Sequence, residues 1–101
     1  MNKLLVVGEG SMGRRHVASA LASGWDAETW DITHGRPLGR ALSLAPDAVA
    51  VATPASTHAA VALQLADSGY AGPLFVEKPL ALSEEDADVF SSWPHAVTAV
   101  G

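Results

Sequence analysis

Three glycines near the N-terminus restrict the folds open to this chain more than any other feature of its sequence. The apolar segment 3–7 ends at Gly8, and Gly10 and Gly13 follow with the spacing Gly-x-Gly-x-x-Gly. Segment 11–23 then has the apolar periodicity and the alanine content of a helix. A glycine-rich turn that joins a buried strand to a helix is typical of the first β-α-β unit of an α/β domain.

Composition narrows the class of protein. The chain has 101 residues, of which 49% are hydrophobic and 17% charged, which favours one compact domain over a disordered chain. No apolar run approaches the ~20 residues that a membrane span needs, and the N-terminal apolar run is too short for a signal peptide. The absence of cysteine and a net charge of -5 with scattered basic residues fit a cytoplasmic protein that does not bind nucleic acid.

Strand and helix patterns alternate along the whole chain. Strands are expected at 3–7, 27–32, 48–53, 74–76 and 96–100, and helices at 11–23, 37–45, 56–68 and from Ser83 onward. Segment 48–53 is apolar on both faces, as expected for a strand that helices cover on both sides. The pattern predicts a doubly wound parallel sheet, the Rossmann fold, in three layers with the strand order 3-2-1-4-5. We expect residues 1–101 to form this one domain, without a second.

The glycine spacing also indicates what the turn could bind. Gly8 would permit the tight turn, Gly10 would leave room for a pyrophosphate, and Gly13 would let the helix approach the sheet. Ser11 and Met12 lie between them, where the first free amides of the helix would meet the phosphates. The turn therefore predicts a bound dinucleotide; the alternative is a glycine-rich turn without a ligand.

An acidic residue after the second strand bears on which dinucleotide is bound. Asp31 would accept hydrogen bonds from the adenosine ribose hydroxyls and repel a 2′-phosphate, which predicts NAD over NADP. Asp31 could instead cap a turn, and the nearby Arg36 could weaken the preference. Arg14 and Arg15 either add positive charge near the phosphates or lie exposed on the first helix.

Two further motifs, together with the glycine turn and His16 behind it, carry a family resemblance. These motifs are Pro-Asp-Ala-Val at 46–49 leading to Thr-Pro-Ala-Ser-Thr-His at 53–58, and Val-Glu-Lys-Pro-Leu at 76–80. Their order and spacing resemble the N-terminal domain of the glucose-fructose oxidoreductase-like (Gfo/Idh/MocA) dehydrogenases over essentially the whole chain. The Glu-Lys-Pro triplet is the most specific of these features.

The resemblance implies a role for each matching residue. Lys78 would be catalytic, beside the nicotinamide, where it would help to position the reacting centre and take part in proton transfer. Glu77 would lie near the nicotinamide ribose. Thr53 and Pro54 would lie against the cofactor at the end of the third strand, and His58 would stand near the same crevice.

Other interpretations of these residues remain open. Glu77 and Lys78 could form a solvated pair at a strand end, and His58 could cap or pack at its helix. We expect His16 to be buried and hydrogen-bonded as a structural residue. The four histidines have no metal-ligand spacing, so no metal is expected.

The resemblance further implies hydride transfer between the nicotinamide and a sugar-like or inositol-like alcohol. Family members continue past the fifth strand into a substrate domain, and the connection between residues 31 and 47 is shorter here than is usual. We therefore expect the chain to be catalytically incomplete alone, and to self-associate or pair with a substrate-domain partner. A non-catalytic nucleotide-binding or assembly module is the alternative. A third possibility is a methyltransferase, which can have a similar glycine loop and an acidic residue after its second strand. The Glu-Lys-Pro triplet argues against it.

Overall fold

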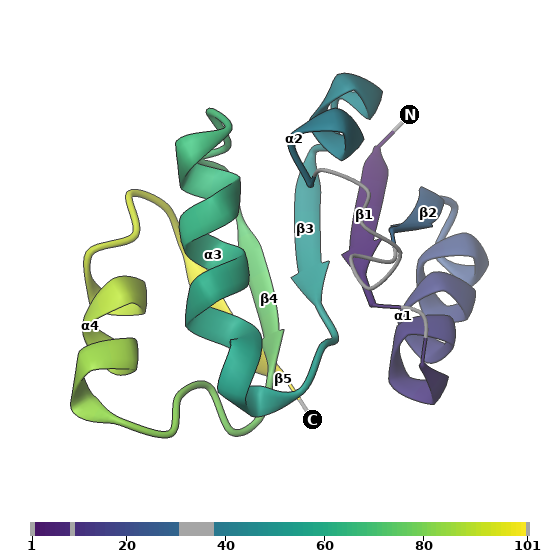
Figure 1. Ribbon diagram of the computed structural model, residues 1–101. Coiled ribbons are helices and arrows are strands. Elements are labelled where there is room, and N and C mark those ends of the chain that lie inside the picture. Colours follow the sequence, from purple (N-terminus) through teal and green to yellow (C-terminus); the bar gives the residue numbers. More distant parts are fainter. Residues whose placement is uncertain (1, 9, 31–37, 101) are drawn as a thin grey trace.

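The computed structural model describes residues 2–8, 10–30 and 38–100, in which strands and helices alternate as predicted (Figure 1). The strands are β1 (Lys3–Val7), β2 (Asp26–Trp30), β3 (Ala48–Val51), β4 (Leu74–Glu77) and β5 (Val97–Val100). The helices are α1 (Ser11–Ala22), α2 (Leu38–Ala41), α3 (His58–Asp67) and α4 (Glu84–Ser91), with short 3-10 turns at Leu42–Leu44 and Ala55–Thr57. The predicted α/β fold class is confirmed.

The strands form one parallel sheet, but the predicted strand order is wrong. The observed order is β2-β1-β3-β4-β5 rather than 3-2-1-4-5. The predicted order would place the third strand at the edge of the sheet, beyond the second. In the structure β3 instead passes to the other side of β1, so that β1 and β3 are neighbours and β2 is an edge strand. This is the other common order of doubly wound sheets.

The composition of the two strands explains the observed order. All four residues of β3 are small or branched apolar residues, and all four are buried. Strand β2 carries Asp26 and Glu28, and none of its residues is buried. Charged side chains are costly in a sheet interior that is covered on both faces. An edge position keeps these two carboxylates in water, whereas β3 loses nothing by lying in the middle.

Helices cover both faces of the sheet, which makes three layers (Figure 1). The larger apolar cluster lies under α2, α3 and α4, and the smaller one lies under α1. The first contains Leu5, Val7, Val49, Val51, Leu74 and Val76 of the sheet, with Val61, Leu65, Phe90 and Trp93 from the α3–α4 side. The second contains Leu4, Val6, Ala48 and Ala50, with Ala20 of α1. The alternation of side chains along each strand divides the core in this way.

The starts of α3 and α4 differ in how they are capped. Ser83, at which the last helix is predicted to begin, caps α4, and its hydroxyl accepts a hydrogen bond from the amide of Asp86 at 3.1 Å. Ser56 does not cap α3: it lies inside a 3-10 turn, and Thr57 is the residue that precedes the helix. Ala66, which follows the buried Leu65 in this helix, is exposed. The extra turn shifts the start of α3 beyond the residue that a capping pattern selects.

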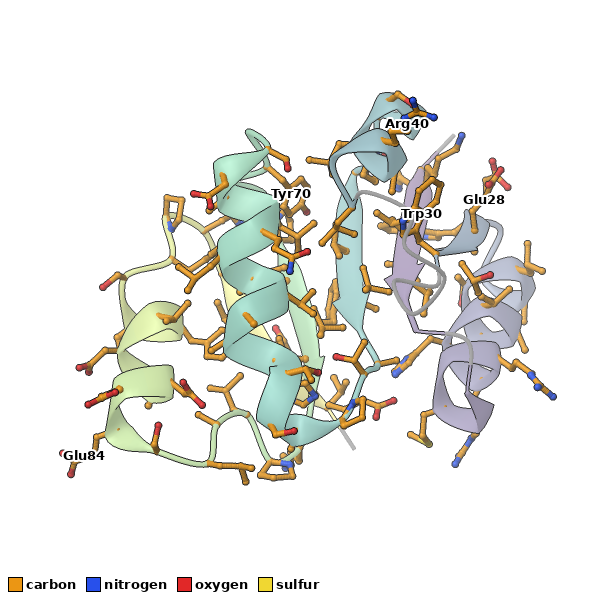
Figure 2. All side chains as sticks on the ribbon, viewed as in Figure 1. Glu28, Trp30, Arg40, Tyr70 and Glu84 are labelled. Atoms are coloured by element: carbon orange, nitrogen blue, oxygen red, sulfur yellow. The ribbon has the colours of Figure 1, made fainter. Side chains whose placement is uncertain are left out.

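Tyr70 and Trp93 close the end of the molecule opposite the carboxyl ends of the strands. Figure 2 shows Tyr70 and Arg40 at that end and Glu84 at the other. The Tyr70 hydroxyl donates to the carbonyl of Pro73 at 2.6 Å, and Trp93 Nε1 donates to the carbonyl of Gly72 at 2.8 Å. Burial of the phenol, and to a lesser extent the charge of Asp47, raises the pKa of Tyr70 to about 12, although the Val49 amide lowers it.

Candidate functional site

The carboxyl ends of three adjacent strands form the edge at which the predicted site residues meet. Val7, Val51 and Val76 are in register across β1, β3 and β4. The residues that follow these strands include Gly8, Thr53 and Lys78. The chain leaves β1 toward β2 on one side, and β3 lies on the other side, so the point at which the strand order reverses is between β1 and β3. The predicted order 3-2-1-4-5 would place this point between the first and fourth strands. Figure 1 shows the three strands ending at this edge.

Two of the three motif glycines are required by the protein itself. Gly8 has a φ of +116°, and a Cβ atom there would lie 2.7 Å from the carbonyl oxygen of Ala52, just after β3. A Cβ on Gly13 would collide with the carbonyl oxygen of Gly8. The first glycine therefore permits the turn beside β3, and the last permits the close approach of α1 to β1.

Gly10 differs from both. Its φ of -71° and ψ of -174° are extended values that most residues adopt freely. A Cβ atom at this position would meet no other atom within 4 Å. Neither the backbone nor the packing of the described residues therefore demands glycine at this position. The space in front of Gly10 is open.

The start of α1 brings backbone amides that have no acceptor within the helix to this space. Gly10 precedes the helix and has no side chain with which to cap it, and the first turn carries no acidic residue. The first amides of a helix have no acceptor within the helix and carry a partial positive charge. Ser11 and Met12 supply two of these backbone positions. Arg14 and Arg15 are exposed, and Arg15 Nη1 lies 3.5 Å from Met12 Sδ.

The loop after β3 is held by two residues of the following turn and helix. Thr57 Oγ1 donates to the carbonyl of Pro54 at 2.6 Å, and it lies 2.8 Å from the hydroxyl of Thr53, from which it can accept a hydrogen bond. His58 is 1% exposed, and its Nε2 lies 2.8 Å from the carbonyl oxygen of Thr53. Its Nδ1 lies 3.1 Å from the carbonyl oxygen of Pro79, beyond β4. His58 is thus an interior residue that links two loops of the edge.

The Glu-Lys-Pro triplet stands at the end of β4. Glu77 Oε1 lies 3.2 Å from His16 Nε2 of α1, and the exposed fractions of these two side chains are 15% and 22%. The amide of Lys78 donates to the carbonyl of Val100 at 2.7 Å, and the Lys78 side chain is exposed. The peptide bond from Lys78 to Pro79 is cis.

The structure brings two residues into this edge to which the sequence pattern assigns no role in the site. The sequence predicts His16 to be buried and hydrogen-bonded; it is hydrogen-bonded, to Glu77, but its side chain stays partly exposed. Thr57 was only part of a motif, yet it braces Thr53. The signal for His16 was its place three residues after Gly13, about one helical turn from the edge. Thr57 gave no such signal, because a 3-10 turn sets its position.

Some predictions fall where the structure gives no test. Asp31 and Arg36 lie outside the described residues. Across the described ranges, no group of three or more histidine or acidic side chains is placed to hold a metal ion. Among the same residues, no helix is long and apolar enough to cross a membrane.

A groove runs along the α1 side of the sheet, behind His16. Its volume is about 260 Å³, and it is open on one side. It is lined by Leu4, His16, Ser19, Ala20, Ser23, Trp25, Ala50, Phe75 and Val100. Helix α1 covers β1 and β2 on this face, while Phe75 of β4 and Val100 of β5 stay partly exposed. The described residues of the glycine turn do not line this groove.

Comparisons with solved structures support the fold and the cofactor class. GenD2 from gentamicin A biosynthesis, in complex with NAD, aligns over 97% of this chain at 27% identity with a TM-score of 0.72. An NAD-binding protein from Listeria innocua aligns over 97% at 27% identity with a TM-score of 0.71. UDP-N-acetylglucosamine 3-dehydrogenase GnnA from Acidithiobacillus ferrooxidans aligns over 96% at 27% identity with a TM-score of 0.72.

The alignments cover nearly all of this chain but only about a third of each of those proteins. The chain spans 34% of the GenD2 and Listeria proteins and 37% of GnnA. No match was found among curated protein sequences. The family model of the Gfo/Idh/MocA oxidoreductases, NAD-binding Rossmann fold, matches residues 25–91, which is more than half of the chain. This chain therefore belongs to the Gfo/Idh/MocA oxidoreductase family and is an NAD-binding domain of the Rossmann type.

Proposed function

We propose that the turn from Gly8 to Gly13 holds the pyrophosphate of NAD(H) against the start of α1. The observation that carries this proposal is the contrast among the three glycines. The protein needs Gly8 and Gly13 for its own packing, whereas nothing in its described residues needs Gly10. A bound pyrophosphate explains the glycine at that position, because its oxygens occupy the space that a side chain would fill. The uncapped amides of α1 supply the hydrogen bonds and the partial positive charge.

The residues after β3 and β4 are proposed to face the nicotinamide half of the cofactor. Thr53 and Pro54 follow the strand next to β1, and Glu77 and Lys78 end the strand after that. His58 would act through Thr53, since both of its ring nitrogens already lie beside backbone carbonyls. The exposed amine of Lys78 is the group in this set that can donate a proton to a substrate oxygen or orient that oxygen.

The reaction proposed for the whole protein is hydride transfer to or from an alcohol carbon of a sugar-like substrate. The bound nicotinamide would supply the hydride chemistry. GnnA, one of the similar structures, is a dehydrogenase of a sugar nucleotide. We expect the 101 residues alone to bind the cofactor without turnover, because hydride transfer requires the substrate carbon to be held against the nicotinamide. We propose that the described residues form the cofactor side of such a crevice.

Calorimetric titration of the wild-type chain with NADH, NADPH and S-adenosylmethionine tests the proposed class of ligand. We expect NADH to bind, NADPH to bind more weakly, and S-adenosylmethionine not to bind. Gly10→Val should abolish NADH binding by filling the pyrophosphate space. Ala22→Val adds comparable bulk at the exposed far end of the same helix and should leave binding unchanged. A folded Gly10→Val protein with wild-type affinity would contradict the proposal.

A further inference from the structure

We infer that His16 and His58 are positioning residues that hold the segment Glu77–Lys78–Pro79 from opposite faces of the sheet, and so place Lys78 at the nicotinamide end of the site. This inference rests on the proposed cofactor site and adds the residues that set its geometry. Neither histidine needs to touch the cofactor for this role. Both act on the neighbours of Lys78.

His16 reaches the segment from the α1 side. Side chains alternate along β4, so Glu77 points to the same face as Phe75, which packs against the α1 cluster. On that face Glu77 Oε1 meets His16 Nε2 at 3.2 Å. Both side chains are largely shielded from water, which strengthens a hydrogen bond to a carboxylate. The contact fixes the orientation of the carboxylate, whose Oε2 makes no hydrogen bond to any described residue.

His58 reaches the segment from the α3 side. Its ring is buried between the loop after β3 and the loop after β4, with its nitrogens 2.8 Å from the Thr53 carbonyl and 3.1 Å from the Pro79 carbonyl. A ring with a single N–H donates to only one of these carbonyls, and the tautomer decides which one. The other nitrogen packs beside the second carbonyl, so one buried ring fills the space between the two loops. A shift of the loop that accepts the hydrogen bond would leave a buried polar atom without its partner, which is costly.

Between these two contacts, the backbone of Lys78 is itself held. Its amide donates to the carbonyl of Val100 of β5 at 2.7 Å. Three successive residues are thus fastened by three different elements: α1, β5 and α3. The long side chain of Lys78 stays free to move, but the point from which it extends does not. Reacting groups lose much of their effect when such a point shifts by about 1 Å.

The His16 contact also connects the two halves of the proposed site. His16 lies on the helix whose first turn would bind the pyrophosphate, five residues after Ser11, or roughly 7 Å along the axis. A rigid helix therefore sets the distance between the pyrophosphate and Glu77. We expect loss of the His16 contact to disturb the nicotinamide end of the cofactor while the pyrophosphate end stays bound.

Comparing NADH with ADP-ribose tests this expectation, because ADP-ribose contains the pyrophosphate but no nicotinamide. Calorimetry on the full chain gives both dissociation constants for wild type, His16→Phe and His16→Gln. His16→Phe should weaken NADH about tenfold, the value of one charge-assisted hydrogen bond. ADP-ribose should change less than about twofold. His16→Gln keeps an N–H donor and should recover most of the loss. His95→Gln, an exposed histidine at the opposite edge, should change neither constant.

Emission from the bound nicotinamide gives a second measurement. NADH bound to His16→Phe should fluoresce differently from NADH bound to wild type, and His16→Gln should restore the wild-type emission. Equal weakening of both ligands would show general damage and overturn the inference. So would unchanged constants in His16→Phe, or a wild type that binds ADP-ribose as tightly as NADH. A folded wild type that binds neither ligand would instead refute the proposed function.

The His58 contact has its own variants. His58→Gln keeps one N–H donor for one of the two carbonyls, and His58→Leu keeps none. We expect the preference for NADH over ADP-ribose to fall in His58→Leu and to fall less in His58→Gln. An unchanged preference in a folded His58→Leu protein would remove His58 from the inference. If His58→Leu does not fold, His58→Gln alone tests the contact. An unchanged preference for NADH over ADP-ribose in that variant would then remove His58 from the inference.

Discussion

Substituting the three motif glycines separates what the fold needs from what the ligand needs. A Cβ on Gly8 would stand 2.7 Å from the Ala52 carbonyl oxygen at a φ of +116°. The unfavourable φ costs about 1–2 kcal/mol, and the crowding about 1–3 kcal/mol more. Gly8→Ala should therefore lose about 2–5 kcal/mol of unfolding free energy. Gly13→Ala should lose a similar amount, since its Cβ would collide with the Gly8 carbonyl oxygen.

Gly10→Ser should behave in the opposite way. The backbone at Gly10 suits a serine, a Cβ would meet nothing within 4 Å, and serine is a better residue than glycine in front of a helix. Unfolding free energy should rise by a few tenths of a kcal/mol. NADH affinity should nevertheless fall about 100-fold, the value of roughly two charge-assisted hydrogen bonds to the phosphates.

Two assays on the same samples measure these effects. Urea denaturation followed by circular dichroism gives the unfolding free energies, and calorimetry gives the NADH dissociation constants. If Gly10→Ser lost as much stability as Gly13→Ala, the protein itself would require Gly10, and the argument for a ligand would fail. If Gly10→Ser were stable and bound NADH like wild type, the pyrophosphate would not lie at this turn.

Three further predictions concern other parts of the chain. The native pKa of Tyr70, about 12, lies above its unfolded value of 10.0, so the unfolded chain loses this proton first and stability should fall as pH rises from about 10 to 12. Tyr70→Phe should flatten that fall, and urea denaturation across this pH range would show whether it does. Asp31→Ala should narrow the gap between NADH and NADPH affinities in calorimetry; an unchanged ratio would remove the role given to Asp31. Light scattering over a concentration series should show self-association, because Phe75 and Val100 stay partly exposed on the α1 face. A strict monomer at high concentration would argue against it.

The local sequence was sufficient to predict the helices and strands, because apolar periodicity and the residues at helix starts are local features. The apolar run before Gly8 and the serine and acidic residues at the start of α4 correctly marked a strand and a helix start. The order of the strands was not recoverable from a fold-level analogy. The order depended on which strand could lie at the edge of the sheet. The carboxylates of Asp26 and Glu28 indicated that this strand is β2, and the predicted order did not take them into account.

For the site, the sequence alone determined the chemical types and their placement at strand ends: a glycine turn after β1, a threonine after β3, and an acid and a lysine after β4. Residues that follow parallel strands meet at one edge, whatever the strand order. Only the tertiary structure decided which contacts those residues make. The pairing of His16 with Glu77 joins positions 61 apart in the chain, and the ring of His58 spans two loops. Such contacts depend on how helices pack across both faces of the sheet, and no local pattern encodes that packing.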